Sequence, residues 1–217
     1  MKFPVLSHTF LNDWDNCPRK AARKYIIKDL PRGEQTEQMK WGDEVHKAFE
    51  LRIKHGTGFP AGMERFEPIA APLAAAGAQA EKMLGIDSHG RSCDFFAKNV
   101  WLRGKVDATV RKDERAAIFD WKTGKRREDP SELHIHALLL RAWDSSIVKV
   151  TASYVWLQED KVGKPYDVSN VMKTMKDICH TADQVERAIE TEHFPPRQNP
   201  LCGWCPVFDC EFNKGEL

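Results

Sequence analysis

Two carboxylates and a lysine in the middle of the chain have the types and spacing of a hydrolytic metal site. Asp107 ends the stretch Gly104-Lys-Val-Asp107, and Asp120 and Lys122 follow in the next β-rich segment. Because side chains alternate along a strand, Asp120 and Lys122 share one face, and a tight turn at 112–115 would bring Asp107 beside them. Carboxylates hold Mg²⁺ or Mn²⁺, and a lysine can stabilise developing negative charge. These residues predict a centre for phosphodiester hydrolysis.

A histidine upstream of the strands supplies a further ligand of suitable chemistry. His46 ends the pattern Trp41-Gly-x-x-x-His46 in a helical segment, and an imidazole nitrogen suits Mn²⁺. Each residue has an ordinary alternative: a lone histidine is most often a core residue, and Asp-x-Lys also occurs on exposed edge strands. The combination with Asp107 favours the metal site over these alternatives.

Four cysteines at the two ends of the chain form a second candidate centre. They are Cys17 near the start and Cys202, Cys205 and Cys210 near the end. The spacing C-x2-C-x4-C plus one distant thiolate suits either a structural zinc ion or an iron–sulfur cluster. We expect the remaining cysteines, Cys93 and Cys179, to be ordinary buried thiols, since disulfides are rare in a reducing compartment.

Composition describes an ordinary water-soluble globule. The 217 residues are 41% hydrophobic and 30% charged with a formal net charge of +1, and a chain of this length can bury a substantial core. No apolar run reaches the roughly 18 residues of a membrane span, and no signal-peptide pattern is present, so we expect a cytoplasmic protein, bacterial or phage-encoded in its host. A basic run after the acidic centre, Lys125, Arg126 and Arg127, is either a solvated face or a contact for phosphate.

Periodicity predicts an α/β protein with a mixed central sheet between helices. Helices are expected over residues 7–25, 34–55, 70–84, 131–143 and 168–191, and strands over 95–102, 106–111, 116–121 and 147–157. We expect one domain over 1–217: a helical part at 1–92, a core at 93–192, and a cysteine segment at 193–217 joined with Cys17.

Taken in order, these motifs resemble the PD-(D/E)XK nucleases of the RecB-like class, and most of all the CRISPR-associated exonucleases of the Cas-four type and their phage relatives. The matching elements are Ser7-x-x-x-Leu11 with Cys17-Pro18, Gly42 to His46, Gly104 to Asp107, Asp120 to Lys122, and Pro196 to Cys210. The resemblance covers essentially the whole chain.

The resemblance implies a restriction-endonuclease-like core and a Mg²⁺- or Mn²⁺-dependent DNA nuclease, acting as an exonuclease on single strands or DNA ends. His46, Asp107, Asp120 and the backbone carbonyl of Trp121 would hold the metal, and Lys122 would assist catalysis. It also favours a [4Fe–4S] cluster over zinc at the four cysteines. Protein partners in recombination or CRISPR adaptation are implied as well.

The chain departs from the family pattern in two places. Where the family carries Gln-x-x-x-Tyr, this sequence has Glu132 and His136, four residues apart on one helical face and ionisable. We expect both to act in the catalytic centre. The last cysteine spacing is one residue shorter than usual. The altered pair motivates an alternative function, a catalytically weakened nucleic-acid-binding subunit of a larger complex, and a zinc-stabilised interaction protein is a second alternative.

Overall fold

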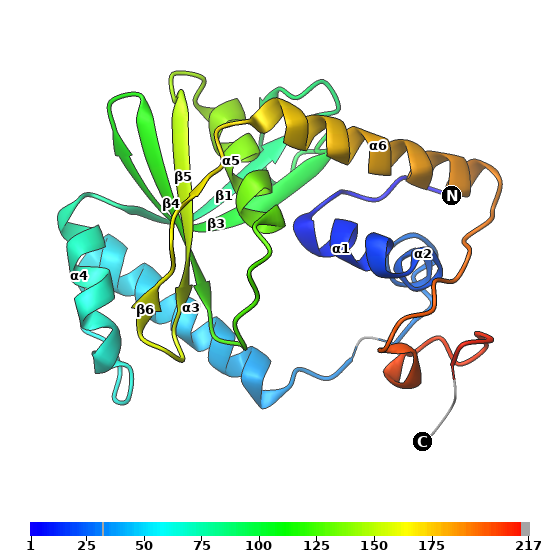
Figure 1. The fold of residues 1–217 in the computed structure, drawn as a ribbon, viewed down its shortest axis with the longest axis horizontal. Coiled ribbons are helices and arrows are strands. Elements are labelled where there is room, and N and C mark those ends of the chain that lie inside the picture. Colours follow the sequence, from blue (N-terminus) through cyan, green and yellow to red (C-terminus); the bar gives the residue numbers. More distant parts are fainter. Residues whose placement is uncertain (32, 214–217) are drawn as a thin grey trace. The chain divides into compact units, whose positions relative to one another are not determined.

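The computed structural model describes residues 1–31 and 33–213, which fall into two compact units (Figure 1). The central unit is Gln35–Thr174, and the terminal unit combines Met1–Glu34 with Met175–Leu217. Among the described residues, no helix is both long and apolar enough to cross a membrane.

A mixed sheet forms the body of the central unit, with strand order β2-β1-β3-β4-β5-β6 and β7 paired to β5. The strands are β1 (Gln79–Ile86), β2 (Ser92–Cys93), β3 (Leu102–Lys112), β4 (Arg115–Lys122), β5 (Lys149–Trp156), β6 (Lys161–Val162) and β7 (Tyr166–Asp167). Among the strand pairs of the described residues, only β4 and β5 are parallel, because α5 (Ser131–Trp143) connects them as a crossover helix. The predicted α/β class with a mixed sheet is confirmed.

Helix α3 (Glu37–His55) packs its apolar stripe into the core beside the sheet. Thr36 caps its start by accepting a hydrogen bond from the Met39 amide at 3.3 Å, and Gly56 ends it at φ 69° in the left-handed region. Its residues Val45, Ala48, Phe49 and Ile53 join a cluster with the short helix η2 (Glu64–Phe66), α4 (Glu67–Ala75) and the strands. This packing fixes the helix that carries His46.

The terminal unit brings the two ends of the chain together. It contains α1 (His8–Asn16), α2 (Pro18–Ala21), a π-helical turn η1 (Ala22–Ile27), all but the first turn of α6 (Val171–Glu190) and the short helix η3 (Cys202–Trp204). Ser7 caps α1 by accepting a hydrogen bond from the Phe10 amide at 3.2 Å, and Pro18 is the first residue of α2. Arg23 pairs with Asp209 at 2.8 Å across the unit.

Two predicted elements are wrong. The helix expected over 70–84 ends at Ala75, and the chain turns at Gly77, with φ 70°, into strand β1. The alanine, glutamate and lysine of that stretch favour a helix locally, but pairing with β3 overrides this propensity. The strand expected over 95–102 is absent, because residues 95–101 form turns and irregular structure and β3 begins only at Leu102.

Candidate active site

Three carboxylates occupy adjacent positions across strands β1, β3 and β4. The pairs Ala80 with Ala108 and Lys82 with Val106 place Glu81 opposite Asp107. The ladder between β3 and β4 ends at Ala108 and Phe119, so Asp107 and Asp120 come directly after its last pair. The predicted approach of Asp107 to Asp120 across the hairpin is therefore present, and Asp107 Oδ2 accepts a hydrogen bond from the Trp121 amide at 2.8 Å.

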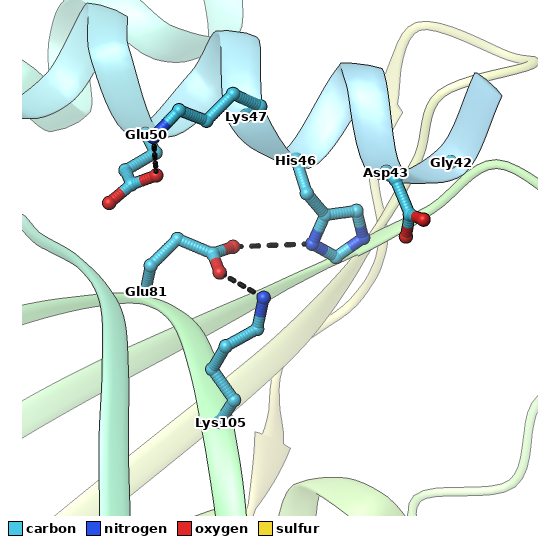
Figure 2. Close-up of a pocket in the computed structure, with 7 residues that line it drawn as sticks. All are labelled: Gly42, Asp43, His46, Lys47, Glu50, Glu81 and Lys105. Atoms are coloured by element: carbon cyan, nitrogen blue, oxygen red, sulfur yellow. Dashed lines mark hydrogen bonds and ion pairs between the residues drawn. The ribbon is translucent and has the colours of Figure 1, made fainter. Parts of the chain in front are cut away.

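Helix α3 adds an imidazole to two of these carboxylates. His46 Nδ1 lies 3.2 Å from Asp107 Oδ1. It also lies 3.3 Å from Glu81 Oε1, and Figure 2 shows this second contact. Burial disfavours the charged imidazole, but its hydrogen bonds to Asp107 and Glu81 outweigh burial and raise the pKa of His46 to about 10. One ligand atom from each of the three residues falls within 4.8 Å of the others, close enough to share a metal ion.

Glu81 is the residue of this group that the sequence did not reveal. It sits in the stretch expected to be helical, where a glutamate looks like a solvated surface residue. In the structure its backbone adopts φ 53° inside a strand, a left-handed conformation that is uncommon for residues other than glycine. Burial opposes ionisation, yet hydrogen bonds from His46 and Lys105 hold the pKa of Glu81 below its usual range.

Lys122 lies on the other side of the carboxylate row, between two acids. Its Nζ is 2.7 Å from Asp120 Oδ2 and 2.6 Å from Glu132 Oε2. Burial opposes the charged ammonium, but the charges of Asp120 and Glu132 dominate and raise the pKa of Lys122. The lysine is therefore a fixed cation at neutral pH.

His136 reaches the same side of the site from α5. It is 3% exposed, which leaves it no surface for contact with a DNA backbone, and its Nδ1 lies 3.7 Å from Asp120 Oδ1. Asp120, Glu132 and His136 form a second group whose ligand atoms lie within 4.8 Å of one another. Burial, and then the charge of Asp107, raise the pKa of Asp120 well above its usual value. Gly104 on β3 lets α5 pack this close to the sheet, because a Cβ at this position would lie 2.9 Å from the Leu139 side chain on α5.

Trp121 fixes the two halves of the site relative to each other. Its side chain points away from Asp120 and Lys122, as strand alternation predicts, and its ring stacks on Phe49 of α3 with centroids 4.3 Å apart. Phe49 and His46 share one helix, so this stack ties the imidazole to the strand that carries Asp120 and Lys122. The role expected for the Trp121 carbonyl as a metal ligand stays a prediction.

The basic run after β4 is partly neutralised within the protein. Arg126 pairs with Glu128 at 2.6 Å and with Glu159 at 3.4 Å. Lys125 and Arg127 are exposed. These two are the members of the run that remain suited to contact phosphate, and their role in DNA binding stays a prediction.

The terminal unit contains all four candidate cluster cysteines. The segment 197–199 links two of them: the Arg197 amide lies 3.5 Å from the Cys17 sulfur and the Asn199 amide 3.3 Å from the Cys202 sulfur. Cys17 is buried, while Cys202, Cys205 and Cys210 are half-buried. The expectation that Cys93 and Cys179 are buried thiols is wrong, because Cys93 is half-buried and Cys179 is exposed on α6.

Comparison with known proteins identifies the family of the chain. Residues 60–210 match the PD-(D/E)XK nuclease superfamily, and the chain belongs to this superfamily. A stretch of 121 residues is 28% identical to the Gene 69 protein of Mycobacterium phage D29, covering 53% of this chain and 44% of that protein, so the chain spans less than half the length of this curated relative.

Two solved structures match this chain at low sequence identity, and the first of them is similar in fold. One is a Eubacterium rectale protein named for an inferred exonuclease activity, with a TM-score of 0.56 and 12% identity over 93% of this chain and 87% of that one. The other is SSO0001, with a TM-score of 0.48 and 18% identity over 97% of this chain and 87% of that one. The predicted membership of the PD-(D/E)XK nucleases is confirmed.

Proposed function

We propose that this protein is a metal-dependent DNA nuclease that acts as an exonuclease on single strands or DNA ends. The observation that carries the proposal is the convergence of His46, Glu81 and Asp107 on one side of Asp120, with Lys122 on the other. Membership of the superfamily supports hydrolysis of nucleic acid. The resemblance to Cas-four-type and phage nucleases supports a role in DNA recombination, repair, phage DNA processing or CRISPR adaptation.

The donor set fits a hard or borderline divalent cation. His46, Glu81 and Asp107 have ligand atoms within 4.8 Å of one another, and Asp120 belongs to the neighbouring group with Glu132 and His136. Carboxylates and an imidazole, all partly or fully buried, match Mg²⁺ or Mn²⁺, and the imidazole favours Mn²⁺. His46, Glu81, Asp107 and Asp120 would hold the ion, with the Trp121 carbonyl as a further ligand. The ion would polarise the scissile phosphate and lower the pKa of the attacking water.

The chain's own residues supply positioning and charge. Lys122, held between Asp120 and Glu132, presents a permanent cation toward the negative charge that develops at the phosphate. Glu132 takes over the support that a glutamine gives in the family, and as an ionised acid it holds the lysine more tightly than an amide would. His136, buried against Asp120, orients that carboxylate and does not touch DNA.

At the chain ends we propose a [4Fe–4S] cluster held by Cys17, Cys202, Cys205 and Cys210. Backbone amides directed at the sulfurs of Cys17 and Cys202 support it, since such hydrogen bonds are typical of cluster thiolates. A structural zinc ion on the same four thiolates is the alternative occupant. For either group the proposed role is structural, closing the terminal unit.

A cleavage assay tests the proposed activity. Purified full-length protein is incubated with end-labelled single-stranded DNA, double-stranded DNA and RNA in Mg²⁺, Mn²⁺ or EDTA. We expect cleavage of DNA from an end, dependent on either cation and abolished by EDTA. Full activity in EDTA contradicts the metal site. Tight DNA binding with no cleavage in any metal favours the alternative of a non-catalytic binding subunit.

A further inference from the structure

A second lysine, Lys105, contacts the carboxylate row on the side opposite Lys122. Lys105 precedes Asp107 by two residues on β3, and its ammonium forms an ion pair with Glu81 Oε2 while Glu81 Oε1 faces His46 (Figure 2). The Lys105 side chain is 47% exposed and the Glu81 side chain only 9%. Glu81 thus connects a lysine that reaches solvent with the imidazole and carboxylate of the metal set.

The surroundings of Lys105 form a pocket open to solvent. The pocket has a volume of about 390 Å³ and is lined by Gly42, Asp43, His46, Lys47, Glu50, Glu81 and Lys105. Lys47 pairs with Glu50 at 2.8 Å, and Glu50 lies outside the proposed metal set. Lys105 has its partner inside the metal set, and any cation that binds this set competes with it for that partner.

We propose that Lys105 is a phosphate-binding residue that a divalent cation releases from Glu81. The inference rests on the proposed nuclease function and deepens it. A divalent ion on His46, Glu81 and Asp107 would take the oxygens of Glu81 and repel the ammonium beside it. The long, flexible lysine stem then lets the ammonium move into the pocket, next to the metal, where a phosphate of the DNA backbone is its natural counter-ion. Metal binding would in this way prepare the site for its anionic substrate.

The proposal predicts two effects of Lys105→Gln in opposite directions. Metal affinity should rise about threefold, in line with the modest strength of a half-exposed ion pair. DNA affinity in the presence of metal should fall several-fold, and the slope of log K against log salt should shrink by about 0.7–0.9, the value of one phosphate contact. If Lys105 only positioned the Glu81 carboxylate for the metal, its removal would instead lower metal affinity.

The experiment measures binding and does not depend on turnover. Mn²⁺ is titrated calorimetrically into the full-length wild type, Lys105→Gln, Lys105→Arg and the control Lys112→Gln, an exposed lysine near the other end of the same strand. DNA binding is measured by fluorescence anisotropy at several salt concentrations with Mn²⁺ present, each variant being placed in a Lys122→Ala background so that the DNA survives. Melting curves confirm that each variant is folded.

Tighter Mn²⁺ binding and a reduced salt slope for Lys105→Gln, with wild-type behaviour of Lys112→Gln and a restored slope for Lys105→Arg, support the proposal. Unchanged or weaker Mn²⁺ binding by Lys105→Gln overturns it, and so does an unchanged salt slope. Failure of the Lys105 proposal is distinguishable from failure of the proposed metal-dependent function. If the proposed function were wrong, the wild-type protein itself would bind no Mn²⁺.

Discussion

Replacement of Lys122 by alanine should separate catalysis from metal binding. The ammonium is 2.7 Å from Asp120 and 2.6 Å from Glu132, and its side chain is 31% exposed. As the electrostatic stabiliser of the site, its loss should lower turnover by about 10²- to 10³-fold. Because the metal ligands stay in place, the Mn²⁺ dissociation constant should change little.

The same substitution should also destabilise the fold. It leaves Asp120 and Glu132 without their shared cation, and breaking a fully buried pair costs about 3–5 kcal/mol. Partial exposure of the lysine reduces this to roughly 1–3 kcal/mol, or about 2–12 °C in melting temperature for a chain of this size. Adding Glu132→Gln removes one of the two stranded charges, so it should recover part of the melting temperature and none of the turnover.

Single-turnover cleavage of end-labelled DNA, Mn²⁺ calorimetry and thermal melting together measure these three quantities. Lys161→Ala, which removes an exposed lysine on β6, serves as the control and should match the wild type in all three. Turnover of Lys122→Ala within about threefold of the wild type would refute the role given to the lysine. Loss of Mn²⁺ binding in Lys122→Ala would refute the claim that the lysine is not needed for metal binding.

Three further perturbations test the core, the surface charge and the cysteine site. Phe49→Ala removes a fully buried ring that stacks on Trp121, so it should cost about 3–5 kcal/mol and weaken Mn²⁺ binding through displacement of His46; a wild-type melting curve contradicts this. Hydrogen bonds from Lys47 and Lys54 hold the pKa of Glu50 at about 2. A carboxylate whose pKa is lowered by folding stabilises the folded state at pH values above its ordinary pKa. The difference in melting temperature between the wild type and Glu50→Gln should therefore be constant above about pH 5 and shrink as the pH falls toward 2. A difference that stays constant over this range would count against the pairing. Cys17→Ser should lose the iron, about four atoms per chain, and have a lower melting temperature, while Cys179→Ser should keep the wild-type iron content and melting temperature. Iron retained in Cys17→Ser would show that Cys17 is not a cluster ligand.

Much of the site was predictable because its signals are local. Alternation along one strand placed Asp120 and Lys122 together and Trp121 on the other face, and the short turn after Lys112 aligned Asp107 with Asp120. Helix α5 begins and ends where the periodicity predicted, at Ser131 and Trp143. Capping by Ser7 was equally a matter of neighbouring residues.

The remainder depends on contacts between distant segments. Glu81 belongs to a stretch of good helix formers, and only its pairing with β3 turns that stretch into a strand and brings the carboxylate to Asp107. Lys105 looked like a surface residue for the same reason, since its partner is Glu81. Likewise, the neutralisation of Arg126 by Glu159 arises from two loops that meet only in the folded sheet.

Titration of Mn²⁺ into the purified protein tests the central claim most directly, that carboxylates from adjacent strands and one imidazole form a single metal site. Calorimetry on the wild type should give saturable binding, and Asp107→Asn should abolish it, because Asp107 lies at the centre of the row and contacts His46 at 3.2 Å. Asp113→Asn, the same change in the exposed turn between β3 and β4, should bind like the wild type. Wild-type affinity in Asp107→Asn, or no Mn²⁺ binding by the wild-type protein, would contradict the account.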